Sequence, residues 1–170
     1  MSVRPFLIWP DRRLRETAAP VLEIDETAHQ IWADMLASMY AMPGVGLAAP
    51  QIGVMQALAV VDCSEGRDQP IRMANPELIW ASDTASRHQE GSPNLPGHWA
   101  MVERPSVVRV RWLDEAGNEQ EREFDGLWAT SVQHQLDHLA GRMFIDRLSA
   151  TKRRMILAKH EKSQRKAART

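Results

Sequence analysis

The stretch that decides the fold is QHQLDHLAG, residues 133–141, which places two histidines four residues apart. On an α-helix, side chains at this spacing project from the same face, one turn apart. His134 and His138 could therefore hold one metal ion between them, and Asp137 could orient a ligand from behind. The spacing leaves open the alternative that the two histidines meet by chance on a solvated helix face.

The residue that follows the first histidine is not an acid. In the H-E-x-x-H pattern, a glutamate at this position takes a proton from a metal-bound water and passes it on. Here the position is Gln135, whose carboxamide keeps the shape and hydrogen bonds of a glutamate but cannot act as a base near neutral pH. The spacing thus indicates a metal, whereas this residue indicates that the usual general base is missing.

Three helices are expected along the chain, and the second of them contains this stretch. Apolar residues at three- and four-residue spacing predict a helix over 27–41, capped by Asp25 or Thr27. The same pattern predicts a helix over 127–140, which carries the histidines. A terminal helix is expected from residue 152 onward, and its inner side is predicted to hold Met155, Ile156 and Ala158.

Strands are expected over Gln56–Asp62, Ile71–Met73, Glu77–Ala81, Val107–Leu113 and Glu119–Phe124, and a turn joins the last two into an antiparallel pair. Residues 83–100, rich in Ser, Gly, Pro and Asn, are expected to be irregular. Strands clustered ahead of a helix, without regular alternation, favour an α+β fold over an α/β fold. The length of 170 residues fits one domain, residues 1–170.

Charge is distributed unevenly along the chain. The net charge is −1, but residues 151–170 hold eight lysines and arginines against one glutamate, so the rest of the chain is acidic. This basic C-terminal helix or tail could reach an anionic partner such as RNA, or it could be a solvated helix end that only aids solubility. The absence of a long apolar run or an apolar signal core, together with a single cysteine, predicts cytoplasmic residence and no membrane partner.

Two further stretches make the chain recognisable. GVGLAAPQIG, residues 44–53, resembles the peptide deformylase signature GxGLAAxQ, and QHQLDHLAG is similar to that family's QHExDHLxG. EGSPNLPG, residues 90–97, stands where the family's EGCLSxPG belongs. Residues 10–15 also resemble the family's N-terminal segment.

The resemblance implies a peptide deformylase-like fold, with mixed or antiparallel β-sheets around a central helix that carries the HxxxH pair, plus a C-terminal helix. It implies a divalent metal, iron(II), nickel or zinc, held by a cysteine and two histidines. The implied reaction is hydrolysis of the N-formyl group from nascent chains that begin with formylmethionine. Gln51 and the backbone N–H after the cysteine are the implied oxyanion donors.

The resemblance also implies partners and a pocket. The partners are the N-terminus of a nascent or formylated peptide, and the ribosome, which would be reached through the basic terminal helix. The implied substrate pocket is formed by Val45, Gly46, Leu47, Glu90, Gly91, Pro93 and Trp99.

The chain departs from the family at several of these positions. Ser92 stands at the cysteine position, and a neutral hydroxyl is a weaker metal ligand than a thiolate. Pro93 has no backbone N–H to offer an oxyanion, and Trp99 stands where many members have an arginine that helps to bind the peptide. With Gln135 in place of the base, we expect weakened or absent metal binding. Glu90 could then replace the ligand or the base, or could form a structural ion pair with Arg104.

Three functions remain for comparison with the structure. The sequence favours a deformylase-like protein that is weakly active or inactive and serves as a peptide- or ribosome-binding paralogue. The alternative is an active metal-dependent peptide deformylase. The third is a structural or interaction protein whose pocket is filled by a side chain such as Trp99 or Met101.

Overall fold

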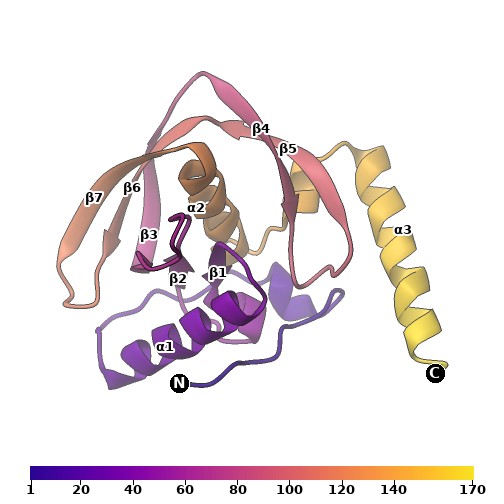
Figure 1. The fold of residues 1–170 in the computed structure, drawn as a ribbon, viewed down its shortest axis with the longest axis horizontal. Coiled ribbons are helices and arrows are strands. Elements are labelled where there is room, and N and C mark those ends of the chain that lie inside the picture. The colour runs from indigo at the N-terminus through magenta and orange to yellow at the C-terminus, as the bar shows by residue number, and fades with distance from the viewer.

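The computed structural model describes residues 1–170, and its central element is helix α2, Gly126–Leu139, with two β-sheets around it (Figure 1). The larger sheet has the order β1-β2-β3-β6-β7, and every neighbouring pair in it is antiparallel. Its strands are β1 (Gly46–Ala48), β2 (Leu58–Val61), β3 (Ile71–Ala81), β6 (Val107–Leu113) and β7 (Glu119–Asp125). The smaller sheet pairs β4 (Ala85–Gly91) with β5 (Trp99–Pro105). The α+β class is confirmed.

Helix α1, Glu26–Ala41, covers the end of the larger sheet that carries β1 and β2 (Figure 1). Trp32, Met35 and Met39 recur at three- and four-residue spacing and are completely buried against Leu58 and its neighbours on those strands. Asp25, rather than Thr27, caps the helix, and its carboxylate accepts from the N–H of Ala28 at 2.9 Å.

Helix α3, Ala150–Ala167, lies at the side of the molecule and ends at the C-terminus (Figure 1). The predicted inner side is partly wrong, because Met155 and Ala158 are exposed. Ile156, Leu157 and the completely buried His160 face the protein instead, since the helix contacts it along a narrow stripe. None of the helices is long and apolar enough to cross a membrane.

Residues 83–100 are not irregular as predicted, because they contain β4 and the start of β5. These strands pair with each other in continuous register, from Ala85 with Pro105 to Gly91 with Trp99. Their buried face carries the charged side chains of Glu90 and Arg104 besides Val102, so alternating hydrophobicity does not reveal it.

The two strands predicted on either side of Pro76 form one strand, β3. The pairing with β6 shifts register between Ala74 and Glu77, and Asn75 has a φ of 51°. Such a bulge lets a proline, which has no N–H, stay within a strand.

Candidate active site

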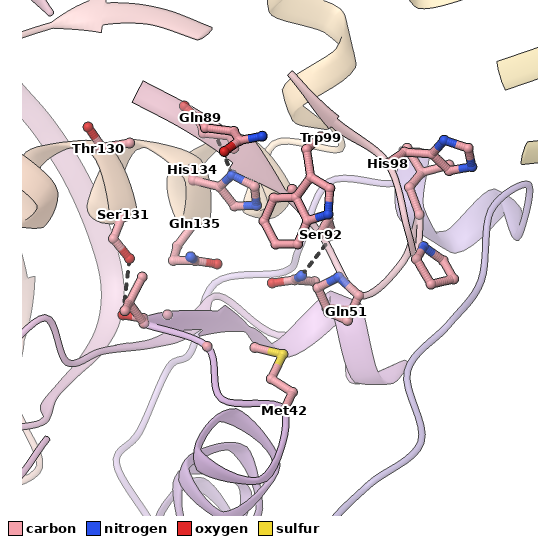
Figure 2. A pocket seen from close by; sticks show the side chains of 18 of the residues that line it. Met42, Gln51, Gln89, Ser92, His98, Trp99, Thr130, Ser131, His134 and Gln135 are labelled. Carbon is pink, nitrogen blue, oxygen red and sulfur yellow. Dashed lines mark hydrogen bonds and ion pairs between the residues drawn. The ribbon is translucent and has the colours of Figure 1, made fainter. Parts of the chain in front are cut away.

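A pocket of about 330 Å³ opens where α2, the loop before β1 and the β4–β5 sheet meet (Figure 2). Residues 42–46 and residues 89–93 both line it, and Figure 2 shows Met42 and Gln89 on different sides of it. Gln51, Ser92, His134 and Gln135, which are widely separated in the sequence, all line it. The fold therefore brings the chemistry-bearing motifs together at one cavity.

The two histidines are buried in the protein rather than solvated, with His134 8% and His138 1% exposed. Their Nε2 atoms lie 3.1 Å apart, one turn apart on α2. Complete burial and the neighbouring His134 hold the pKa of His138 well below its usual range, so this imidazole is neutral. Two imidazole nitrogens that converge in this way are suited to a single metal ion, and the chance meeting on a solvated face is ruled out.

Glu90 is fully engaged by its neighbours behind the histidines. Arg104 donates from Nε and Nη2 to the two carboxylate oxygens, at 2.7 and 2.9 Å. His134 Nδ1 lies 2.8 Å from Glu90 Oε1. Although burial opposes ionisation, the hydrogen bonds from Arg104 and His134 lower the pKa of Glu90 to about 2. Glu90 therefore forms the structural ion pair and is not free to replace a metal ligand or a base.

The bond to Glu90 also sets the tautomer of the first histidine. Because the carboxylate only accepts, Nδ1 of His134 is the donor in this bond, which leaves Nε2 as the nitrogen that faces His138. Glu90 thus does what the sequence expected of Asp137.

Asp137 has a different role from the one predicted. It accepts from Arg104 Nη1 at 2.9 Å and from Arg147 at 3.0 and 2.7 Å, and it makes no hydrogen bond to either histidine. The reason is helix geometry, because each residue turns the side-chain direction by about 100°, which takes residue 137 off the histidine face.

Gln51 is held in place by a residue that the sequence did not single out. Its Oε1 accepts from the N–H of Ala48 at 2.9 Å, and its Nε2 donates to Asn94 Oδ1 at 2.8 Å and to Ser92 Oγ at 3.4 Å. Ser92 Oγ in turn donates to Asn94 Oδ1 at 2.9 Å. Asn94 is completely buried and also donates to the backbone oxygen of Leu7 at 2.6 Å. Nothing in the sequence around Asn94 indicates that this residue holds Gln51 in place.

Gln135 contributes a buried acceptor that has no partner. Its side chain lies beside Gly46, where a Cβ would collide with the carboxamide nitrogen, and only 4% of the residue is exposed. Its Oε1 makes no hydrogen bond. An unpaired buried oxygen costs free energy, and this carboxamide lies among the residues that line the pocket (Figure 2).

Most of the predicted pocket residues do line the cavity, namely Val45, Gly46, Glu90, Gly91, Pro93 and Trp99. Leu47 does not, because it is completely buried in the core beneath α1. Trp99 stands at the pocket edge with 62% of its surface exposed, and Met101 is 46% exposed. Neither side chain fills the cavity, so the hypothesis of a structural protein with a closed pocket is wrong.

Comparisons with known proteins all lead to the same family. The family model described as polypeptide deformylase matches residues 3–154. A peptide deformylase of Methylocella silvestris is 45% identical over 168 residues, which is 96% of this chain and 86% of that protein. One from Cellvibrio japonicus is 42% identical over 169 residues, 99% of this chain and 100% of that protein.

Solved structures agree with these relatives. The crystal structure of a peptide deformylase from Legionella pneumophila superposes with a TM-score of 0.92 at 39% identity, covering 99% of both chains. A peptide deformylase from Ehrlichia chaffeensis in complex with actinonin has a TM-score of 0.92 at 32% identity, covering 97% of this chain and 99% of that one.

Proposed function

The chain belongs to the polypeptide deformylase family, and we propose that it is an active, metal-dependent deformylase that removes the formyl group from N-formylmethionine of nascent proteins. The observation that carries this proposal is the convergence of the His134 and His138 Nε2 atoms, 3.1 Å apart, beside an open pocket. Relatives named peptide deformylase, 42–45% identical over nearly the whole chain, support the same reaction.

This proposal corrects the expectation of a weakly active or inactive paralogue. That expectation rested on the joint presence of Ser92, Pro93 and Gln135 at positions where the family's motifs have other residues. The full-length relatives overturn it, since nothing in them indicates a degenerate site. The expected weakening of metal binding likewise finds no support.

The family is metal-dependent, and the residues present fit a divalent ion. Two convergent imidazoles would hold it, and imidazole suits zinc, iron and nickel alike. The site offers no third His, Cys, Asp or Glu, so oxygen from Ser92 or water would complete the ligands. When bound, such an ion polarises the formyl carbonyl and activates water.

The protein's own polar groups position the reactants. Gln51 Nε2 keeps one hydrogen on Asn94 Oδ1, and its second hydrogen, which makes only a 3.4 Å bond to Ser92 Oγ, turns to the carbonyl oxygen as negative charge develops on it. Gln135 Oε1 accepts a hydrogen bond from the attacking water or the formamide N–H, which satisfies its buried oxygen. Gln135 positions this group and does not take its proton, so the proton of the water must pass to the amide nitrogen as the C–N bond breaks and the amine leaves.

The peptide is proposed to lie extended between residues 42–46 and residues 89–93. Strand β4 pairs only with β5, so its other edge is free to pair with a substrate strand along 89–91. The formyl group then reaches Gln51 and the histidines, while the rest of the peptide leaves through the open mouth.

The basic helix supports a proposal about location. Nearly all the lysines and arginines of α3 are exposed at the side of the molecule (Figure 1). We propose that this helix binds ribosomal RNA in the cytoplasm, where formylated chains emerge. Binding to purified ribosomes that weakens steeply with added salt supports this proposal, and equal binding by a chain with the four lysines changed to glutamine contradicts it.

Formate release tests the proposed reaction. Protein purified anaerobically is supplied with iron(II), nickel or zinc and a formylmethionyl peptide. We expect metal-dependent release that His134→Ala abolishes. His29→Ala, which changes an exposed histidine on α1, is the matched control and should keep full activity. No release with any of the metals would overturn the proposal.

A further inference from the structure

Part of the backbone that lines the pocket is held from behind by a loop of the larger sheet. We call residues 44–46, which lead from α1 into β1 and line the pocket, the glycine segment. Arg67, in the loop between β2 and β3, donates from Nη2 to the carbonyl oxygen of Gly44 at 2.5 Å. Arg67 does not line the pocket itself, so any influence that it has on a ligand passes through the glycine segment.

Two features of its surroundings aim Arg67 at Gly44. Its φ is 52°, in the left-handed region that residues with a side chain seldom adopt. Its guanidinium lies over the ring of Tyr40, in the last turn of α1, at 5.2 Å from the ring centroid. An arginine that served only solubility would need neither feature, and a disfavoured backbone angle persists only where the neighbouring structure fixes it.

Asp62 organises the loop that carries Arg67. Its carboxylate is completely buried and accepts from the hydroxyl of Tyr40 at 2.5 Å, the N–H of Ser64 at 3.0 Å and the N–H of Gln69 at 3.3 Å. The N–H of Arg67 donates to the carbonyl oxygen of Ser64 at 3.2 Å, which closes a turn. The loop and the end of α1 therefore form one hydrogen-bonded unit behind the glycine segment.

The glycine segment needs this support because its own backbone is permissive. Two glycines flank Val45, and glycine adopts many backbone conformations. The carbonyl oxygen of Val45 accepts from the N–H of Asp62 at 3.0 Å and from Ser131 Oγ at 3.1 Å (Figure 2). The carbonyl oxygen of Gly44 accepts only from Arg67. Removing this one side chain therefore releases the first residue of the segment.

We propose that Arg67 is a positioning residue, which holds the glycine segment in the conformation that binds the substrate peptide and does not touch the peptide itself. This inference rests on the proposed function, in which the peptide lies extended beside this segment. A segment that binds the peptide equally well before and during the reaction affects affinity rather than the chemical step. Loss of Arg67 should therefore raise KM and leave kcat almost unchanged.

The test compares KM and kcat for formyl-Met-Ala-Ser in the metal-loaded native chain and its variants. Arg67→Met should raise KM about tenfold, as the loss of one charge-assisted hydrogen bond does, with kcat within about twofold of the native value. Arg67→Lys keeps the charge and a donor, so its KM should lie between these two.

Arg72→Met is the matched control and should keep the native KM. The charge of Arg72 also acts on Tyr40, but its side chain pairs with Glu115 instead of the glycine segment. A KM in Arg67→Met within about twofold of the native value, an equal rise in Arg72→Met, or a fall in kcat as large as the rise in KM overturns the proposal.

Binding without turnover separates this proposal from the proposed reaction. The affinity for N-acetyl-Met-Ala-Ser is measured by calorimetry on the native chain and on Arg67→Met, after circular dichroism has shown that the variant is folded. Arg67→Gln, which is polar but shorter, replaces Arg67→Met if that variant does not fold. If no formate is released but the Arg67 variant binds the peptide about tenfold more weakly, the reaction fails and the positioning role stands. Equal affinity in both proteins, or neither binding nor turnover by the native chain, overturns the role.

Discussion

Behind the two histidines the buried charges all have partners, whereas on the pocket floor a buried carboxamide oxygen has none. Glu90, Arg104 and Asp137 satisfy one another through hydrogen bonds of 2.7–2.9 Å. Gln135 Oε1, on the residue that follows His134 in α2, has no hydrogen-bond partner. The difference separates two tasks, because a satisfied network holds the ligand histidines rigidly, while an unsatisfied group is left for the substrate.

Arg104→Met should have the largest effect, since it breaks the network behind the histidines. It removes the guanidinium that joins the buried carboxylates of Glu90 and Asp137 and leaves His134 as the only hydrogen-bond partner of Glu90, at a cost of about 3–5 kcal/mol in the free energy of unfolding. Denaturant unfolding measures it. Arg111→Met, which removes an exposed ion pair with Glu77, should change the free energy of unfolding far less, because solvent screens exposed pairs. Similar losses for both variants would show that the buried network does not stabilise the fold.

Gln51→Ala should have the next largest effect, but on rate rather than stability. Removing an oxyanion donor lowers kcat by about a hundredfold to a thousandfold. Gln69→Ala, an exposed glutamine outside the pocket, serves as the control. A kcat within threefold of the native value would mean that another group receives the developing charge.

Acid should lower the free energy of unfolding, because Glu90 becomes protonated. Its pKa is about 2 in the folded protein against an ordinary 4.5, so the unfolded chain takes up the proton first as the pH falls. The stabilisation is complete above about pH 5 and is lost as the pH falls from about 4.5 toward 2. Unfolding free energies measured across this range should fall less steeply for Glu90→Gln than for the native chain. Parallel curves would refute this assignment.

Gln135→Met should have the smallest effect, because it removes one hydrogen bond from the floor. The side chain keeps its size, and the unpaired oxygen disappears, so stability should stay the same or rise slightly. We expect kcat/KM to fall about tenfold. Gln120→Met on the exposed strand β7 is the control. An unchanged kcat/KM would show that Gln135 has no part in the reaction.

The same comparison shows what the sequence could and could not predict. The spacing of His134 and His138 and the apolar periodicity around them predicted α2, its ligands and the fold class. The contacts that organise the site come from distant segments. Arg104 reaches Glu90 from the neighbouring strand, and Asn94 reaches Gln51 across the pocket base. The Glu90–Arg104 pair was expected only because both residues match the family pattern, and nothing in the sequence indicated the pairing of Asn94 with Gln51.

The function was the part most easily misjudged. Ser92, Pro93 and Gln135 each break a motif, and added together they predicted an impaired enzyme. The structure keeps the pocket open and the two histidines convergent, and the relatives over the whole length are named as deformylases. For this chain, the open pocket, the convergent histidines and the full-length relatives are a better basis for proposing a function than the number of altered motif positions.

The most direct test is a titration of metal-free protein with one divalent metal while formate release from a formylmethionyl peptide is followed. The account predicts that activity rises with added metal and reaches a plateau at one ion per chain, and that His138→Ala shows neither the binding nor the activity. Formate release that stays absent at every metal ratio, or that is equally fast in His138→Ala, would contradict it.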